Sequence, residues 1–330
     1  MSTCNQDRGF VMDIAKQIAA IKFDEKQVTP ETALKEYISS LAKSSRRSRL
    51  FALKTVAKFF ASRGVEVSAE ELSYNFEIWV HLDSAFVLAL YEWMMANGYS
   101  VNSAQVVKSF VFAQLKLLHQ CGMITHDKLG SIYILTKTGR LSDGKKPKWY
   151  GRKGVLSDEQ AHRLKNNHDT ETVCGRRDKL LMHILLDHGL RRSEVVGLEI
   201  DNIDIMKGVM KFYRSKTDTW TTVKLTDATM AALKEHVGKD GVQRGALIQS
   251  VNRGDNIEGA IKSGVAINNI VKRLVQDILK NEIEISAHDC RHYWATKRAE
   301  EGATALQLMR EGGWSSLNSV MIYIHDKATQ

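Results

Sequence analysis

The 330-residue chain is poor in the features that mark secreted and membrane proteins. Its four cysteines, Cys4, Cys121, Cys174 and Cys290, match neither a disulfide framework nor a metal site, which favours free thiols in a reducing compartment. No apolar run approaches the roughly 18 residues that suggest a membrane span. The first residues also lack the basic segment and apolar core of a secretory leader. We therefore expect a soluble intracellular protein without a membrane partner.

Positive charge, in contrast, is in excess. Lys and Arg total 47 against 38 Asp and Glu, which gives a formal charge of +9 and a pI near 9.2. Such a surface suits a protein that neutralises DNA phosphates, but many unrelated proteins are equally basic. With 43% hydrophobic residues, the chain is globular and long enough for two cores. Composition thus predicts two domains and agrees with a DNA partner without identifying it.

Helical patterns dominate the N-terminal part of the chain. Residues 1–28 form an extension with apolar residues at helical spacing, which predicts a short amphipathic helix. Residues 29–135 predict a compact bundle of four helices. The first begins at Pro30, the second ends near Gly64, the third runs from Asp83 to Ala96, and the fourth from Ser103 to Cys121.

A run of serines and arginines, Ser44 to Arg49, lies near one helix start of this bundle. Cations and hydroxyls at a helix start are well arranged for phosphate contacts. The candidates for DNA binding are Arg46, Arg47 and Arg49. Taken alone, however, a charge run is more often a solvated helix face.

Composition changes between residues 136 and 155, where basic residues stand among glycines and a proline. The cations include Lys145, Lys146 and Lys148, and the segment predicts a basic linker. It is either a disordered connection or a segment that becomes ordered on binding. A helix cap at Ser157 follows, so the second domain is expected over residues 156–330.

This second domain contains both helical and strand patterns. Helical patterns at about 158–166 and 175–188 precede two strand patterns, 209–213 and 221–225, which a polar turn separates. Helices account for most of the remainder. The predicted fold class is therefore mostly α with a small β-sheet, in which an N-terminal helical bundle precedes a mixed α/β domain.

Short motifs in the second domain carry the chemistry. They are Gly189-Leu190-Arg191-Arg192-Ser193-Glu194, then Lys216 in the polar turn, then His288-Asp289-Cys290-Arg291, then Gly312-Gly313-Trp314, then Tyr323. Two arginines, a histidine, an indole donor and a phenol are what a protein needs to attack a phosphodiester without a metal ion.

This ordered set resembles the tyrosine recombinase, or phage integrase, family. The first motif is similar to the family's first arginine box, and Lys216 to its β-hairpin lysine. Trp314, nine residues before Tyr323, is most similar to the Cre type, in which tryptophan replaces a second histidine. The catalytic residues that the resemblance implies are Arg191, Lys216, His288, Arg291, Trp314 and Tyr323.

The resemblance implies site-specific DNA recombination by a two-domain clamp on double-stranded DNA, with the linker crossing the DNA backbone. Tyr323 would form a 3′-phosphotyrosyl link, so that neither ATP, metal nor another cofactor is needed. Four protomers would exchange strands through a Holliday junction, with accessory proteins as further candidate partners. Such a protein would act in the cytoplasm, at the nucleoid of a bacterial or phage-type host. Only seven residues follow Tyr323, so we expect protomers to assemble through other surfaces than an exchanged C-terminal helix.

Residue chemistry suggests how the phosphate would be held. Planar guanidinium groups match phosphate oxygens, so Arg191 and Arg291 would grip the group as negative charge develops on it. Trp314 would add an indole N–H donor and has no acid or base capacity. Glu194, one helical turn after Arg191, is expected to orient this site from behind the reacting groups.

Two further residues would move protons. A phenol holds its proton at neutral pH, and His288, one turn before Arg291 on the same helix face, is the candidate base. The departing 5′ oxygen needs a proton in return. Lys216 is the candidate acid, because an ammonium gives up a proton more readily than a guanidinium does.

Other interpretations of these residues are weaker. His288 and His292 have the H-x-x-x-H spacing of a metalloprotease helix, but an arginine would stand beside the metal and no third ligand is evident. His292 would otherwise be a core histidine, and Trp314 and Tyr323 taken alone would be packing aromatics. No carboxylate spacing supports a metal-dependent transposase. The alternative from another class is a catalytically silent DNA-binding relative of the same fold, which the intact motifs oppose.

Overall fold

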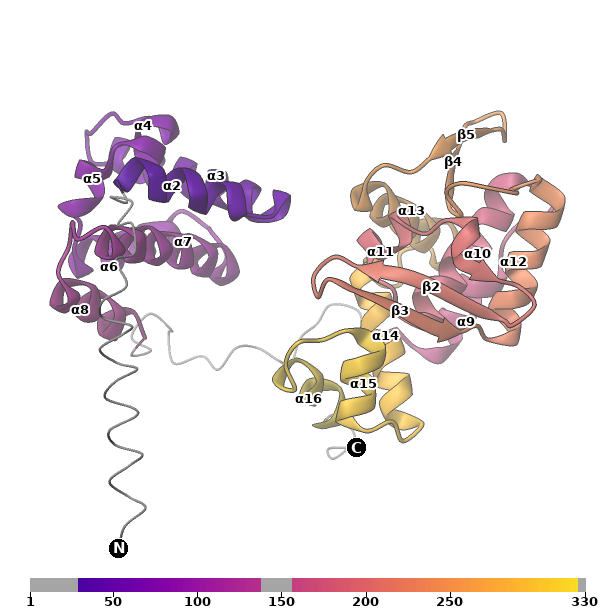
Figure 1. Cartoon of the computed structure of the whole chain (residues 1–330). Helices are drawn as coiled ribbons and strands as arrows, with labels where there is room; N and C mark the ends of the chain where they lie inside the picture. The colour runs from indigo at the N-terminus through magenta and orange to yellow at the C-terminus, as the bar shows by residue number, and fades with distance from the viewer. Residues whose placement is uncertain (1–28, 138–155, 326–330) are drawn as a thin grey trace, which may run out of the picture. The chain divides into compact units, whose positions relative to one another are not determined.

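The computed structural model of the chain describes residues 29–137 and 156–325. The chain divides into two compact units between Lys148 and Trp149 (Figure 1). This boundary falls inside the predicted linker 136–155, most of which lies outside the described residues, as does the predicted extension 1–28. Each unit has its own hydrophobic core.

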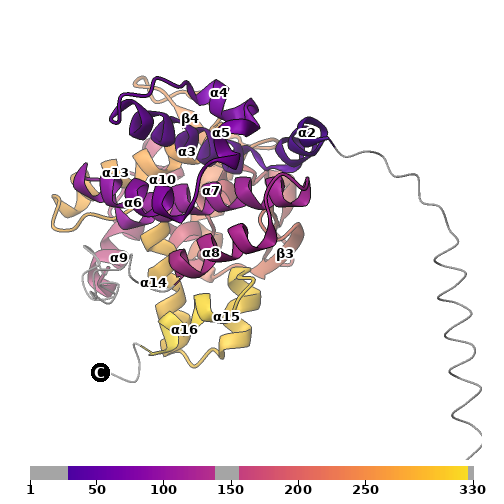
Figure 2. The same cartoon turned by 90° about the vertical axis from the view of Figure 1, so that its left-hand side faces the viewer.

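The N-terminal unit is helical throughout its regular elements in the part that the structure describes. The bounds are α2 (Pro30–Ser40), α3 (Lys43–Ala61), α4 (Ala69–Tyr74), α5 (Phe76–Val80), α6 (Ser84–Ala96), α7 (Val101–Gln120) and α8 (His126–Lys137). Helix α7 is central, because α2, α3, α5, α6 and α8 all pack against it (Figure 2). Trp79, Leu115 and Leu118 are fully buried in the core that these helices share.

The four predicted helices correspond to α2, α3, α6 and α7, whereas α4, α5 and α8 were not predicted. Helices α4 and α5 have six and five residues, too few turns to show an apolar period. Side-chain caps begin both of them, through Ser68 and Asn75. Helix α8 contains Gly130, which lowers helix propensity in its interior.

The C-terminal unit combines helices with two small antiparallel sheets. Its helices are α9 (Asp158–Asn166), α10 (Val173–His188), α11 (Arg192–Val196), η1 (Ile200–Asn202), α12 (Asp227–Asp240), α13 (Gly264–Leu279), α14 (Ala287–Glu300), α15 (Ala305–Gly312) and α16 (Asn318–His325). One sheet has the order β1 (Ile203–Asp204), β2 (Val209–Arg214), β3 (Thr219–Lys224), and the other pairs β4 (Gln249–Val251) with β5 (Ile257–Ala260).

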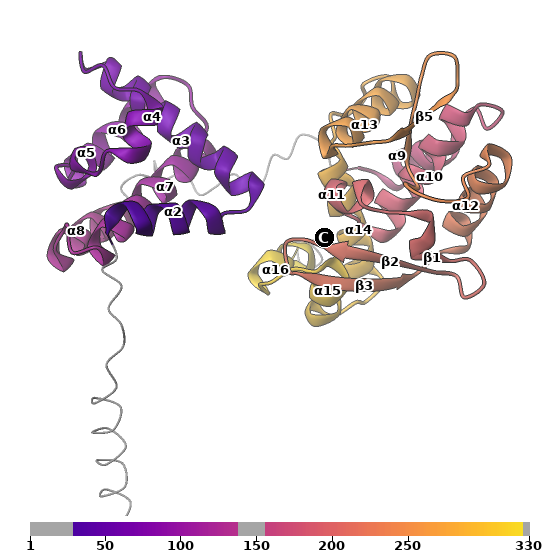
Figure 3. The ribbon, with the colours of Figure 1, turned by 45° about the horizontal axis from the view of Figure 1, so that its top comes forward.

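Helix α10 is the centre of this unit, since α9, α12 and α14 pack against it (Figure 3). Leu181 and Leu185 of α10 are fully buried in the main core. The prediction of a mostly α fold with a small sheet is confirmed, although strands β4 and β5, of three and four residues, were too short to predict from periodicity. No helix within the described ranges is long and apolar enough to cross a membrane.

Strands β2 and β3 form the predicted hairpin, shifted by no more than two residues from the expected bounds. Burial alternates along β2, so that Met210, Phe212 and Arg214 point inward while Lys211 and Tyr213 are exposed. The strands pair in register from Val209–Lys224 to Arg214–Thr219. Strand β2 thus ends on the buried Arg214, immediately before the turn.

A smaller core joins α14, α15 and α16 and contains Trp294, Leu308, Val320 and Tyr323. Helix α14 begins at a capping box, in which the Ser286 backbone N–H donates to Asp289 Oδ2 at 2.8 Å. Asp289 belongs to the His-Asp-Cys-Arg motif. The motif therefore sets the start of the helix that carries its own histidine and arginine.

Candidate active site

The first arginine motif lies where α10 ends and α11 begins. Gly189 has φ of 62°, and a Cβ there would stand 2.3 Å from the Trp294 ring, so both the backbone and the packing require glycine. The Arg191 backbone N–H donates to Glu194 Oε2 at 2.8 Å, and Arg191 Nη1 donates to Glu194 Oε1 at 2.7 Å. Glu194 thus caps the start of α11 and also holds the Arg191 guanidinium. This contact is compatible with the orienting role, which stays a prediction.

Three arginines, Arg191, Arg214 and Arg291, converge on the backbone of Gly312 and Gly313, and we call them the arginine cluster. Arg191 Nη2 donates to the Gly313 carbonyl at 2.8 Å, and Arg214 Nη1 donates to the Gly312 carbonyl at 2.6 Å. Arg291 Nη2 donates to the same Gly312 carbonyl. The three side chains come from the start of α11, the end of β2 and the middle of α14, so only the folded unit brings them together.

The arginine cluster carries more positive charge than its carboxylate neutralises. Glu194 is 4% exposed and pairs with both Arg191 and Arg214. Arg291 is 1% exposed, and burial, followed by the charge of Arg191, lowers its pKa to about 9. Burial also lowers the pKa of Arg214. Cations held away from water are stabilised by an anion, and forked guanidinium groups suit one with several oxygens, such as a phosphate.

Trp314 forms one wall of the cluster. The guanidinium carbon of Arg291 lies 4.1 Å from the centroid of the indole ring, a cation–π contact. Gly312 leaves room for this ring, because a Cβ there would meet it at 1.9 Å. The centroid of the Tyr323 ring lies 5.5 Å from that of Trp314. The predicted nucleophile and a predicted phosphate grip therefore contact the same indole.

One histidine bonds the Tyr323 hydroxyl, and a second histidine packs against the first. The Tyr323 hydroxyl and His292 Nδ1 lie 2.5 Å apart in a hydrogen bond, and Tyr323 is 4% exposed. The His288 ring stands at the edge of His292, with centroids 4.5 Å apart, and His288 is exposed. Sequence reasoning named His288 and left His292 as a core histidine. His292 could have been identified from the sequence, because it follows Arg291 directly and lies one helical turn after His288.

Lys216 lies in the turn between β2 and β3 and is exposed. It takes no part in the hydrogen bonds described above for the arginine cluster. Arg214, two residues earlier, was not predicted to belong to the site. The alternation along β2 could have identified it, because Arg214 lies on the same inward-facing side of the strand as Met210 and Phe212. A charged residue at an inward position must find partners within the fold.

The cations predicted to contact DNA are placed differently from one another. Arg46 is exposed and donates to the Ser39 and Leu41 carbonyls at 3.0 Å, and Arg47 is exposed. Arg49 differs from them: it is 6% exposed, and its Nη1 donates to Gln114 Oε1 of α7 at 3.0 Å. This contact favours a role in the bundle, and the predicted phosphate contact of Arg49 stays a prediction. Lys145, Lys146 and Lys148 lie outside the described residues.

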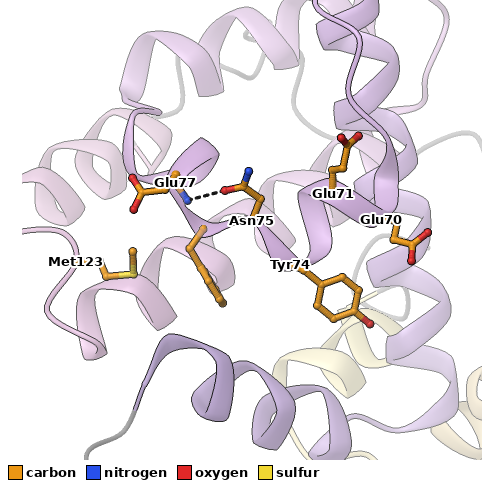
Figure 4. A pocket seen from close by; sticks show the side chains of 7 residues that line it. Glu70, Glu71, Tyr74, Asn75, Glu77 and Met123 are labelled. Carbon is orange, nitrogen blue, oxygen red and sulfur yellow. Dashed lines mark hydrogen bonds between the residues drawn. The ribbon is translucent and has the colours of Figure 1, made fainter.

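Two hollows on the N-terminal unit differ in charge. One, of about 470 Å³, lies among α2, α3 and α7 and is bordered by Ser44, Ser45 and Ser48. The other, of about 650 Å³, is bordered by Glu70, Glu71 and Glu77 around the exposed Tyr74 (Figure 4). Carboxylates repel phosphates, so the serine-lined side is the better candidate for a DNA-facing surface.

In the part of the chain that the structure describes, no three or more His, Cys, Asp or Glu side chains are grouped to hold a metal ion. Of the pair with metalloprotease spacing, His292 bonds the Tyr323 hydroxyl, and the ring of His288 packs against that of His292.

Comparisons with known proteins agree with this arrangement. A family model described as the phage integrase family matches residues 154–330. Tyrosine recombinase XerD of Staphylococcus aureus (strain Mu50 / ATCC 700699) is 26% identical over 180 residues, which cover 53% of this chain and 59% of XerD. Tyrosine recombinase XerC of Pelotomaculum thermopropionicum is 28% identical over 174 residues, covering 52% and 56%. The chain thus spans less than two thirds of the length of these curated relatives.

Solved structures resemble the fold. The Tn1549 transposon integrase in complex with transposon right end DNA has a TM-score of 0.60 at 16% identity, covering 90% of this chain and 94% of that one. A lambda integrase dimer bound to a COC′ core site has a TM-score of 0.52 at 15% identity, covering 98% and 89%. The XerH recombinase bound to palindromic difH substrate has a TM-score of 0.56 at 18% identity, covering 76% and 70%.

The family model covers more than half of the chain, including every motif from which the family was predicted. The arginine cluster, Trp314 and Tyr323 lie together inside that match. The predicted family is therefore confirmed: this chain belongs to the phage integrase family of tyrosine recombinases.

Proposed function

We propose that the protein is a site-specific DNA recombinase that cuts and rejoins DNA through Tyr323. The observation that carries this proposal is the surplus of positive charge in the arginine cluster, one indole ring away from a phenol. A phosphodiester supplies the anion that such a cluster needs, and the phenol supplies the nucleophile. XerD and XerC, which align with about half of this chain, are tyrosine recombinases by name.

The proposed reaction assigns one step to each of these groups. On binding DNA, phosphate oxygens replace the Gly312 and Gly313 carbonyls as acceptors for Arg191 and Arg291. The Tyr323 oxygen then attacks phosphorus, its proton passes to the His288–His292 pair, and the bond from phosphorus to the 5′ oxygen breaks. Lys216 donates a proton to that oxygen. One ester replaces another, so the reverse attack by a 5′ hydroxyl rejoins the DNA without ATP.

The wider scheme is also part of the proposal. Two pairs of strands would be exchanged in turn through a Holliday junction within a tetramer on DNA, with the two units and the linker enclosing the duplex. The Tn1549 transposon integrase structure is a complex with transposon right end DNA, which supports a DNA partner for a chain of this fold. The protein would act on DNA in the cytoplasm of a bacterial host.

Covalent capture tests this function. The wild-type protein is incubated with a genomic and plasmid DNA library, denatured, and the DNA that stays attached is sequenced. We expect one recurring site from wild-type protein and none from Tyr323→Phe, which should bind that site almost as tightly because it lacks one oxygen and no charge. Activity should persist in excess EDTA. A covalent adduct with Tyr323→Phe would refute the assignment, and wild-type binding without any adduct would identify a silent DNA-binding relative.

A further inference from the structure

We infer that Arg214 is a positioning residue that holds the turn bearing Lys216 against the arginine cluster; this inference rests on the proposed function. Arg214 is the last residue of β2, and Lys216 follows two residues later in the turn. In register, Arg214 pairs with Thr219, the first residue of β3. The arginine therefore stands at the base of the turn that presents the lysine.

One side of the guanidinium joins the two strands of the hairpin. Arg214 Nε donates to Thr221 Oγ1 of β3 at 2.8 Å. The guanidinium carbon also lies 4.7 Å from the centroid of the Phe212 ring, two residues back on β2. These contacts fix the arginine relative to both ends of the turn.

The other side of the guanidinium joins the hairpin to the phosphate-binding region. Arg214 Nη1 donates to the Gly312 carbonyl at 2.6 Å and lies 3.3 Å from Glu194 Oε1, the carboxylate oxygen that also pairs with Arg191. Arg214 Nη2 donates to the Glu311 carbonyl. One side chain thus links the lysine turn, the carboxylate that orients Arg191 and the segment that precedes Trp314.

The fold makes room for this side chain at a specific glycine. A Cβ on Gly313 would stand 2.6 Å from Arg214 Cδ, and Gly313 has φ of 61°. Arg214 itself is 1% exposed. A shorter or differently shaped residue at position 214 would remove the donor to the Glu311 carbonyl and one of the two donors to the Gly312 carbonyl. A side chain at position 313 would displace the arginine.

Arg291 is as deeply buried as Arg214, but only Arg214 also bonds the partner strand of the hairpin that bears Lys216, and this contact favours a positioning role. Nε, Nη1 and Nη2 of Arg214 all have acceptors within the protein, and the side chain is almost completely buried. Arg191 is the more exposed member of the cluster, at 19% of its side chain. Arg214 therefore acts through the lysine that it places, and misplacing a proton donor by about 1 Å costs on the order of a hundredfold in rate.

A substrate with sulfur in place of the bridging 5′ oxygen tests this role, because a thiolate leaves without a proton. Single-turnover cleavage of the captured site is measured with the oxygen and the sulfur substrate. Lys216→Ala should be slow on oxygen and recover on sulfur. Arg214→Met should show the same pattern, losing about a hundredfold on oxygen and recovering most of it on sulfur. Thr221→Val, which removes only the Nε acceptor, should show a smaller loss with the same recovery.

The control is Arg177→Met, which removes an equally buried arginine of the same unit whose Nη1 donates to the Gln249 carbonyl. It should affect both substrates equally. Recovery of Lys216→Ala without recovery of Arg214→Met or Thr221→Val would overturn the role of Arg214 alone. If Arg214→Met does not fold, Thr221→Val decides by itself. Failure of Lys216→Ala to recover would remove the acid and this inference with it, whereas cleavage by Tyr323→Phe would overturn the proposed function.

Discussion

Both units bury arginine side chains, but the hydrogen-bond partners of these side chains differ between the units. In the N-terminal unit, Arg49 donates to the Gln114 side chain and to Ser73, which are neutral groups. In the C-terminal unit, three arginines donate to the carbonyls of Gly312 and Gly313, and two of them share the single carboxylate of Glu194. The first arrangement is one cation in a polar niche of a helical bundle, and the second is a concentration of like charge.

The difference is what we expect between an arginine that supports the fold and arginines that bind an anion. A single buried cation whose donors all have neutral acceptors stabilises the elements that it joins. Three neighbouring cations repel one another, and burial raises the cost because water no longer screens the repulsion. A fold retains such a cluster where an anion completes it. The comparison therefore predicts different consequences for substitutions in the two units.

The largest expected effect is at Arg291. Arg291→Ala should lower the rate of covalent cleavage by about a hundredfold to a thousandfold, because one cation that stabilises the developing phosphate charge is lost. The matched control is Arg298→Ala on the same helix, since Arg298 already pairs with Glu301 and Glu311. It should change the rate much less. An equal loss of cleavage rate in both variants would show that the positive charge of Arg291 does not contribute specifically to catalysis.

The next effect concerns acid stability of the C-terminal unit. Burial lowers the pKa of His188 from 6.5 to about 4, while Asp187 and His183 act in opposite directions, and His188 Nε2 lies 3.0 Å from Thr229 Oγ1. The unfolded chain therefore binds a proton between pH 6.5 and 4 that the folded chain does not. Stability should fall through this window as the pH falls, by up to about 3 kcal/mol from this residue.

Chemical denaturation at pH 7 and pH 4 measures this contribution. His188→Gln should unfold with a smaller difference between the two pH values than the wild type, whereas His162→Gln, at an exposed position of α9, should leave the difference unchanged. An unchanged pH dependence in His188→Gln would contradict the assignment.

A smaller effect is expected at Arg49 in the N-terminal unit. Arg49→Met should lower the free energy of unfolding by about 1–3 kcal/mol, because Gln114 and Ser73 lose their donor. Cleavage per folded molecule should remain close to that of wild type, measured by active-site titration with a covalent substrate. A selective loss of cleavage in fully folded protein would place Arg49 on the DNA, as the sequence first suggested.

The smallest effect is expected at Arg47. Arg47→Ala should leave thermal unfolding within about 0.5 kcal/mol of wild type, as is usual for an exposed position. If Arg47 contacts a phosphate, the slope of log affinity against log salt should become shallower by about 0.9. Glu77→Gln, beside the acidic hollow, is the control that should leave this slope unchanged. No change with Arg47→Ala would assign the position to a solvated helix face.

Much of the fold could be predicted, and apart from α8 the failures have a common cause. The long helices α3, α6, α7 and α10 show apolar periods over several turns, and the β2–β3 hairpin shows alternation on both sides of a polar turn. The missed elements are short, such as α4, α5, β4 and β5. They are held by caps and by packing against neighbours rather than by a period of their own.

The chemistry of the site was determined by the sequence alone, because it depends on residue types in a fixed order. Arg191, Arg291, Trp314 and Tyr323 could be named from their motifs, and the structure brings all four into contact through one cluster and one indole ring. The spacing within each motif was sufficient to name these residues, because the motifs lie at helix ends. The first arginine motif, for example, caps α11 through Glu194.

Tertiary structure alone decided which further side chains complete that site. Arg214 and the Gly312 carbonyl are 98 residues apart in the chain, and His292 and Tyr323 are 31 apart, so no local pattern pairs them. Arg49 and Arg47 stand in the same basic run, yet packing against α7 turns one inward and leaves the other in solvent. Motifs specify reactive groups, but burial and the choice of partner depend on how distant elements pack, which one-dimensional spacing does not contain.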